Sequence, residues 1–391
     1  MNTTIIRLTI MAALVLTFVG CSQDEEASKK FDLNVTQVQS LYEPDNGKDI
    51  VLHYQADTPP LRFAWEPAMA NDNGMVLYEI AFDKIDGDFS KPVARFASNN
   101  NGAYTYSTIA HKQMNKIALA AGIGTGQTGT FKWTVFSSKG INPVKAAQER
   151  TITIKRLSGF ADMPARVYLT GAGSEAGTDL SKALVMKQVD DGEFEIYTRL
   201  TAGQPFKYVD ATSGASRTFY VDNSGAIKED ATGTTTINKT GVYHVYLDFN
   251  APVCTYREIT RVSLFLNWSQ KRVDLSYTGL GVWNFTNYTM NFGLSADGNN
   301  SDDRYKFRMT TSAGESEWRS LLSNDSKPGA TPAPSYYYMV EKFNVTQWTN
   351  GEIWKHPMSL TATDGWDGKT YNVSFILKGD SPYTHTFSVT K

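Results

Sequence analysis

Apolar and polar residues alternate with a period of two in several segments of the chain. The clearest segments are 49–54, 61–65, 76–83 and 130–136. Clusters of Gly, Asn, Asp and Pro separate them, as at 44–47. Alternation bounded by turn residues is typical of short strands that bury one face. We therefore predict an all-β protein built of tandem β-sandwich domains, the first of them immunoglobulin-like.

One segment departs from this pattern. Residues 107–121 have helical spacing of apolar side chains and end before Gly122, which predicts a single helix. Trp65 and Trp133 lie within strand patterns, and we expect both in the core. The Gly-x-Gly-x-x-Gly match at 124–129 follows the helix and precedes a strand. A dinucleotide site needs the reverse order, so we predict a loop there.

The first residues have the pattern of an export signal. An apolar run at 8–19 follows Arg7 and is too short to span a bilayer as a helix. Gly20 and Cys21 close it in a sequence that resembles a bacterial lipobox, so we predict acylation at Cys21. An ordinary signal peptide with an unrelated Cys is the alternative.

The residues after Cys21 are polar and acidic. Ser22 and the acidic cluster 24–26 resemble signals that sort lipoproteins to the outer membrane and to the cell exterior. A solvated linker would have the same composition. We predict an outer-membrane, lipid-anchored protein that faces outward.

Length and internal similarity divide the chain. After a signal peptide (1–20) and an acylated tether (21–30), we predict an immunoglobulin-type domain at 31–156 and two further β-sandwiches at 158–260 and 261–391. The last two resemble diverged copies of one unit. The matching segments are 166–169 with 261–264, 205–209 with 304–308, and 241–247 with 369–375.

The copies differ in one insertion. Between matching landmarks, 36 residues separate Lys207 from Tyr243, but 65 separate Lys306 from Tyr371, so the last domain has about 29 additional residues. This span contains four of the eight tryptophans, namely Trp318, Trp348, Trp354 and Trp366, whereas the middle domain has none. Because functional residues tend to collect on loops of a rigid scaffold, we expect a ligand here. Packing of the insertion under itself is the alternative.

One strand pattern suggests how a ligand is held. In segment 304–309, Tyr305, Phe307 and Met309 should face the core, which leaves Arg304, Lys306 and Arg308 as a row of donors on the other face. Aromatic rings stack on the apolar face of a pyranose while charged groups bind its hydroxyls. An ordinary solvated strand face would look the same. The predicted site residues, in order of preference, are Trp318 beside Lys306 and Arg308, then Trp348 and Trp354, with Trp268 in reserve.

Signs of other chemistry are weak. The formal net charge of −2 gives no reason to expect nucleic acid as a partner. Cys254 is the only cysteine besides Cys21, and the five histidines lack metal-ligand spacing, so we predict no disulfide, no metal and no cofactor. No nucleophile elbow or phosphate loop occurs, and we predict a protein that is not an enzyme.

Several segments resemble a known family. Residues 42–47, 78–84, 87–92 and 131–140, together with the lipobox, resemble the SusE/SusF-type surface glycan-binding lipoproteins of Bacteroidetes polysaccharide-utilisation systems. The resemblance implies an immunoglobulin-like spacer followed by carbohydrate-binding sandwiches with a Lys near a stacking Trp. It also implies partners, namely a polysaccharide or oligosaccharide, a TonB-dependent transporter and a SusD-like protein. The middle domain lacks the Trp, so whether it binds stays open.

Two rival functions remain at this level. A surface adhesin or structural lipoprotein could use the same sandwiches to bind proteins. A divergent glycosidase would need two carboxylates across a sugar, which sequence spacing cannot place. Binding to glycans and release of reducing sugar would separate these functions.

Overall fold

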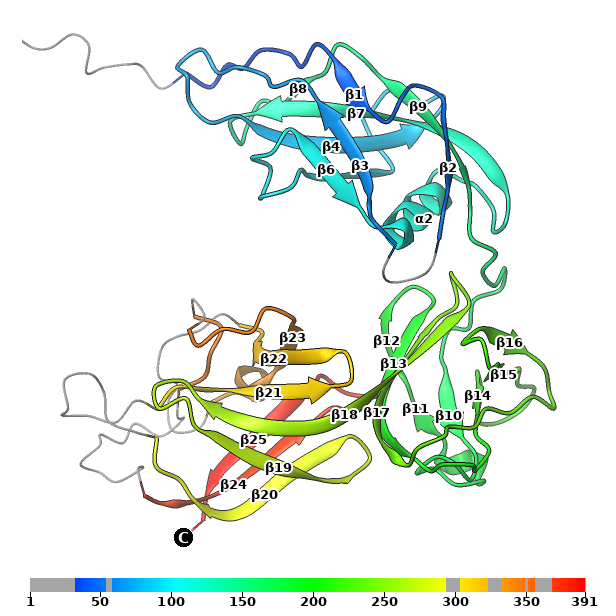
Figure 1. Ribbon diagram of the computed structural model, residues 1–391, viewed down its shortest axis with the longest axis vertical. Helices are drawn as coiled ribbons and strands as arrows, with labels where there is room; N and C mark the ends of the chain where they lie inside the picture. The colour runs from blue at the N-terminus through cyan, green and yellow to red at the C-terminus, as the bar shows by residue number, and fades with distance from the viewer. Residues whose placement is uncertain are drawn as a thin grey trace, which may run out of the picture. The chain divides into compact units, whose positions relative to one another are not determined.

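The computed structural model describes residues 32–53, 58–292, 303–322, 332–348, 351–355 and 368–390. The described residues are dominated by strands, with one α-helix and two short 3-10 helices among them, so the predicted all-β class is confirmed (Figure 1). The chain forms two compact units, Met1–Arg156 and Leu157–Lys391. We describe each by itself.

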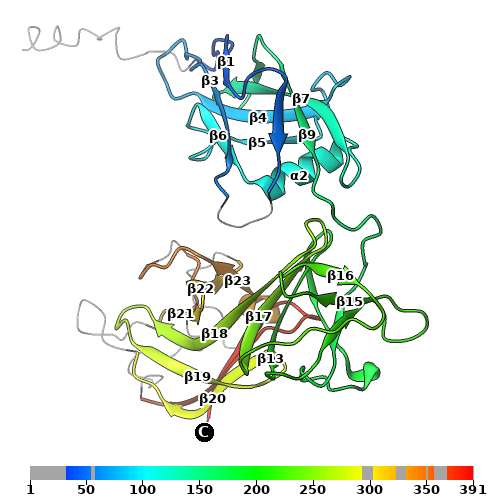
Figure 2. The ribbon, with the colours of Figure 1, turned by 45° about the vertical axis from the view of Figure 1, so that its right-hand side comes forward.

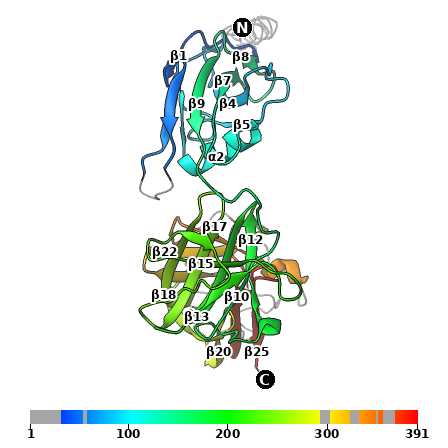
Figure 3. The ribbon, with the colours of Figure 1, turned by 90° about the vertical axis from the view of Figure 1, so that its right-hand side faces the viewer.

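The first unit has two sheets that enclose an aromatic core. The three-stranded sheet has the order β1-β3-β6, and the other has the order β2-β9-β7-β4-β5 with β8 paired to β7. Figure 3 shows β9, β7, β4 and β5 of the larger sheet side by side. Phe63 of β3 contacts Trp133 of β7 with ring centroids 5.1 Å apart, which joins the sheets. Trp65 and Trp133 are at most 1% exposed, as predicted. The bounds are β1 Leu41–Glu43, β2 Lys48–Val51, β3 Leu61–Trp65, β4 Leu77–Lys84, β5 Ala94–Ala97, β6 Tyr106–Ile109, β7 Thr128–Ser138, β8 Val144–Lys145 and β9 Arg150–Lys155.

The helix is shorter than predicted. Helix α2 spans His111–Ala120 and ends before Gly122, whose φ of 93° suits glycine. The prediction is confirmed for this part and wrong for 107–109, which belong to β6. There Ile109 lies opposite Leu61 of β3, because tertiary pairing outweighs the local helical spacing. Of the loop predicted at 124–129, residues 124–127 form a loop as expected, whereas Thr128 and Gly129 already belong to β7.

The second unit contains a five-stranded and an eleven-stranded sheet. We call residues 158–260 the middle lobe and residues 261–391 the C-terminal lobe. The five-stranded sheet consists of β10 Tyr168–Thr170, β11 Leu184–Val185, β14 Lys207–Val209, β15 Thr218–Val221 and β16 Ile227–Glu229. The eleven-stranded sheet consists of β12 Lys187–Asp190, β13 Glu193–Leu200, β17 Gly241–Asp248, β18 Val253–Leu266, β19 Arg272–Gly279, β20 Val282–Thr289, β21 Tyr305–Thr311, β22 Gly314–Ser320, β23 Met339–Lys342, β24 Thr370–Ile376 and β25 Thr384–Val389. The 3-10 helices are η1 Leu180–Lys182 and η2 Pro334–Tyr337.

Strand β18 joins the two lobes without interruption. Its first half pairs with β17, and its second half pairs with β19 and β21, so the boundary predicted at 260/261 lies inside one strand (Figures 1 and 2). The repeat is visible in the pairing register. Leu169 of β10 lies opposite Tyr208 of β14, and Leu264 of β18 lies opposite Phe307 of β21, which are the matching positions. β18 thus contributes a strand to each copy.

The shared sheet also has a core on each face. On β13, Ile196 belongs to the core of the middle lobe and Tyr197 to the core of the C-terminal lobe. On β17, Val245 belongs to the first core and Val242 packs against the second. Because alternate residues of a strand point to opposite faces, these strands hold the two lobes together. The C-terminal lobe therefore has a rigid base.

Candidate functional site

Strand β21 has the predicted alternation, but neither face is open. Tyr305, Phe307 and Met309 are at most 1% exposed and lie in the core. On the opposite face, the Lys306 side chain is 0% exposed and that of Arg308 only 11%. Two of the three basic residues of the row, Lys306 and Arg308, are thus covered and do not face solvent.

The acidic side chain that explains this burial is Glu317 on β22. Its carboxylate lies 2.8 Å from Lys306 Nζ, 3.1 Å from Arg308 Nη2 and 2.7 Å from Arg319 Nη2, and its side chain is 0% exposed. Arg319 also pairs with Glu352 at 3.0 Å. Burial lowers the pKa of Lys306 to about 8, and the Glu317 carboxylate opposes that shift. We call Lys306, Arg308, Glu317 and Arg319 the charge cluster.

The charge cluster fastens the segment that covers it, residues 343–348, which we call the covering segment. The Thr346 backbone N–H donates to Glu317 Oε1 at 3.0 Å, and the Thr346 carbonyl accepts from Lys306 and from Arg308, the latter at 3.0 Å. Gln347 and Asn267 exchange two hydrogen bonds between side chain and backbone, at 2.8 and 3.1 Å. Lys306 and Arg308 therefore bind protein backbone in this structure, whereas the sequence suggested that they bind ligand.

Two of the four candidate tryptophans are core residues. Trp318 is 1% exposed and packs edge-on against Tyr197 and Phe375, and Trp354 is 0% exposed and donates from Nε1 to the Tyr336 carbonyl at 2.8 Å. Neither presents a ring face to solvent. Their burial follows from pairing, since Trp318 lies directly opposite the core residue Phe307 and Trp354 lies opposite the core residue Tyr305.

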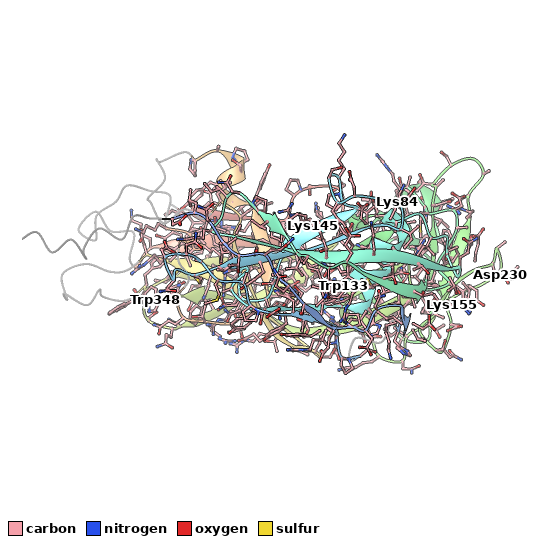
Figure 4. All side chains as sticks on the ribbon, turned by 90° about the horizontal axis from the view of Figure 1, so that it is seen from above. Lys84, Trp133, Lys145, Lys155, Asp230 and Trp348 are labelled. Atoms are coloured by element: carbon pink, nitrogen blue, oxygen red, sulfur yellow. The ribbon has the colours of Figure 1, made fainter. Side chains whose placement is uncertain are left out.

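The other two come together at the surface. Trp348 ends the covering segment, and Trp268 follows β18; their ring centroids are 6.2 Å apart and their planes differ by 48°. Trp348 is 39% exposed and Trp268 is partly exposed. The guanidinium carbon of Arg304 lies 4.4 Å from the centroid of the Trp348 ring. Figure 4 shows Trp348 at the outer edge of its lobe. We call Trp268 and Trp348 the tryptophan pair.

The charge cluster explains how an exposed pair keeps a defined geometry. Fixing a loop and its side chains costs conformational entropy, which a ligand would otherwise have to supply on binding. Here the buried ion pairs hold the backbone at Thr346, two residues before Trp348.

The sequence analysis did not identify Glu317 as part of the site. The signal was available, because a hairpin turn at Gly314 sets Arg308 opposite Glu317.

Other site chemistry is limited in the described residues. Among them, no group of three or more His, Cys, Asp or Glu side chains could hold a metal ion, and no helix is long and apolar enough to cross a membrane. Cys254 is buried, and burial raises the pKa of its thiol to about 12, which makes it a poor nucleophile. Cys21, the acidic cluster 24–26 and Trp366 lie outside the described residues.

The protein is thus an all-β protein of tandem domains, and the sheet of its second unit carries an exposed pair of tryptophans. Residues 25–136 match the model of the family described as SusE outer membrane protein. The predicted resemblance to SusE-type proteins is thereby confirmed over this segment, and the description of the family implies an outer-membrane location.

Comparison with individual proteins adds little. No curated protein matches the chain. Among solved structures, the crystal structure of SusF from Bacteroides thetaiotaomicron is similar at 12% sequence identity and a TM-score of 0.25, over 92% of this chain and 76% of that chain.

Proposed function

We propose that the protein is a non-catalytic, lipid-anchored glycan-binding protein of the cell surface, and that the tryptophan pair is its binding surface. The observation behind this proposal is the exposed pair of Trp268 and Trp348, with Arg304 beside it and a buried charge cluster beneath. Two tilted indole rings offer apolar faces for pyranose rings, and a guanidinium can donate to sugar hydroxyls. The SusE match and the lipobox support the same role.

In this role the protein captures polysaccharide beside a TonB-dependent transporter and a SusD-like partner. Affinity electrophoresis of the mature protein in gels that contain soluble starch, β-glucan, galactomannan or polygalacturonate tests the binding. We expect retardation by at least one polysaccharide without release of reducing sugar. Retardation by none, or release of reducing sugar by the pure protein, would contradict the proposal.

The anchor gives a separate prediction. Cys21→Ala should move the protein from the membrane fraction to the soluble fraction, because a multiply acylated Cys contributes about 0.8 kcal/mol per buried methylene. Fractionation of cells followed by immunoblotting measures this. Cys254→Ala is the matched control and should stay in the membrane fraction, since that thiol is buried. Equal membrane association of the Cys21 variant and the wild type would exclude the anchor.

A further inference from the structure

A second concave site lies in the same unit, away from the tryptophan pair. A cavity of about 280 Å³ opens between strands β17 and β18 on one side and the β21–β22 turn and the end of β23 on the other. We call it the junction pocket, because both lobes line it. The side chains that matter here are His244, Arg257, Glu315, Ser316, Glu341 and Phe343.

Arg257 is the first reason to expect a ligand. It lies on β18 directly opposite His244 of β17, is only partly exposed, and lines the pocket. Across the described ranges of the chain, no side chain or carbonyl forms an ion pair or hydrogen bond with its guanidinium. Most Arg side chains of this unit's interior do form such pairs, as Arg308 and Arg319 show. A partly buried guanidinium with five donors, none of them bonded to an acceptor in the described part of the chain, is suited to bind acceptors from outside.

The polar side chains around Arg257 are held in place by their own contacts within the protein. Ser316 Oγ donates to Glu341 Oε1 at 2.6 Å, and burial raises the pKa of the Glu341 carboxyl above its usual value. The His244 ring is stacked on Tyr197 at 4.5 Å, and its Nε2 donates to Glu195 Oε2 at 2.8 Å. Glu315 is held by Arg272. These groups keep a mixed donor and acceptor lining in one arrangement.

Charge decides the kind of ligand. One cation, Arg257, lines the pocket together with the carboxyl groups of Glu315 and Glu341, so an added anion would meet negative charge and an added cation would meet Arg257. A neutral ligand with several hydroxyl groups can accept from Arg257 and donate to Glu341 without either penalty.

Phe343 supplies an apolar face at the rim. Its side chain is 71% exposed, but the residues on either side of it are held in place. Lys342 lies opposite Glu317 in the backbone pairing of β22 and β23, and the Asn344 carbonyl accepts a hydrogen bond from Arg319. A single exposed apolar residue is common on protein surfaces. Here the exposed ring borders a polar pocket, and the backbone that carries it is held in place. A pyranose can therefore contact the ring with its apolar face and the pocket with its hydroxyl groups.

We propose that the junction pocket binds a neutral sugar unit, with Phe343 against its ring and Arg257 and Glu341 on its hydroxyls, as a second site beside the tryptophan pair. This inference rests on the proposed function for its ligand class. It uses residues of both lobes on the shared sheet and requires none of the tryptophans. The covering segment connects the two sites, since Phe343 begins it and Trp348 ends it.

The test compares four forms of the mature protein by affinity electrophoresis in soluble starch, β-glucan, galactomannan and polygalacturonate: wild type, Arg257→Met/Phe343→Ala, Trp268→Ala/Trp348→Ala, and all four changes together. We expect the pocket variant to bind about tenfold more weakly than wild type. We expect the variant of the tryptophan pair to keep residual binding that the fourfold variant loses. Arg261→Met, an exposed position on the same strand, is the matched control and should bind like wild type.

The outcomes separate the two proposals. A pocket variant that binds like wild type overturns the junction site and leaves the tryptophan pair untouched. Loss confined to the pocket variant would instead support the junction site and contradict the pair. Retardation by polygalacturonate alone would overturn the neutral ligand class. Thermal melting completes the test. Since no hydrogen bond or ion pair from the described residues holds the Arg257 guanidinium, Arg257→Met should not lower Tm, and a marked fall would show that Arg257 is structural.

Discussion

Replacing Trp348 by alanine is expected to weaken glycan binding about ten- to hundred-fold while leaving the melting temperature nearly unchanged. An aromatic face covered by a ligand contributes roughly 1–3 kcal/mol, which corresponds to that range of affinity. The small effect on stability follows from position, because the ring is 39% exposed and ends a segment that is fastened at Thr346. Trp268→Ala should behave similarly, since its ring is the neighbour of Trp348.

Two variants make this result interpretable. Leu321→Ala removes a 54% exposed apolar side chain of the same lobe and should change neither affinity nor Tm. Trp354→Ala removes a fully buried ring and should lower stability by roughly 3–5 kcal/mol. Isothermal titration and differential scanning calorimetry measure the two quantities. If both variants of the tryptophan pair bind like wild type, the glycan site lies elsewhere.

The strand pattern predicted the fold well because it depends on local alternation. The segment 61–65 is a strand with the bounds expected, and β21 turns Tyr305, Phe307 and Met309 to the core. What covers the opposite face of β21 depends on residues about forty positions later in the chain, in the covering segment. A local pattern cannot predict such a long-range contact, and the row of donors therefore looked open to solvent.

The choice among tryptophans shows where pairing information would have helped. Composition identified a Trp-rich stretch but does not distinguish a core ring from a surface ring. A hairpin centred near Gly314 sets Trp318 opposite Phe307 and Glu317 opposite Arg308. Directly opposed residues share a face of the sheet. Trp318 therefore lies on the core face with Phe307, and Glu317 lies on the face of the basic residues with Arg308. Trp318 was the preferred site residue because the register of this hairpin was not considered, although the turn residues near Gly314 indicate it.

The continuity of the last two sandwiches was not visible in the sequence. The repeat places an end of one copy and a start of the next at 260/261, which reads as a domain boundary. In the structure, β18 continues through this point and pairs on both sides. Two short strands from adjacent copies and one long shared strand have the same local pattern, because alternation continues across the junction.

Glu317→Ala is expected to destabilise the second unit by about 3–5 kcal/mol, because it would leave three cations in a buried cluster without their common carboxylate. Lys306, whose side chain is 0% exposed, could lose its proton, but Arg308 and Arg319 cannot do so near neutral pH. The change also removes the acceptor for the Thr346 N–H and so releases the covering segment.

The measurement is urea unfolding of the mature protein, followed by tryptophan fluorescence, to which Trp65 and Trp133 of the first unit also contribute. Asp274→Ala is the matched control, because it removes a carboxylate from the exposed pair with Arg261 in the same lobe and should cost no more than about 1 kcal/mol. Glu317→Gln keeps the shape and an acceptor for Thr346, so it should cost less than alanine but still weaken glycan binding by loosening Trp348. A Glu317→Ala protein as stable as the Asp274 variant would show that the charge cluster does not hold the covering segment.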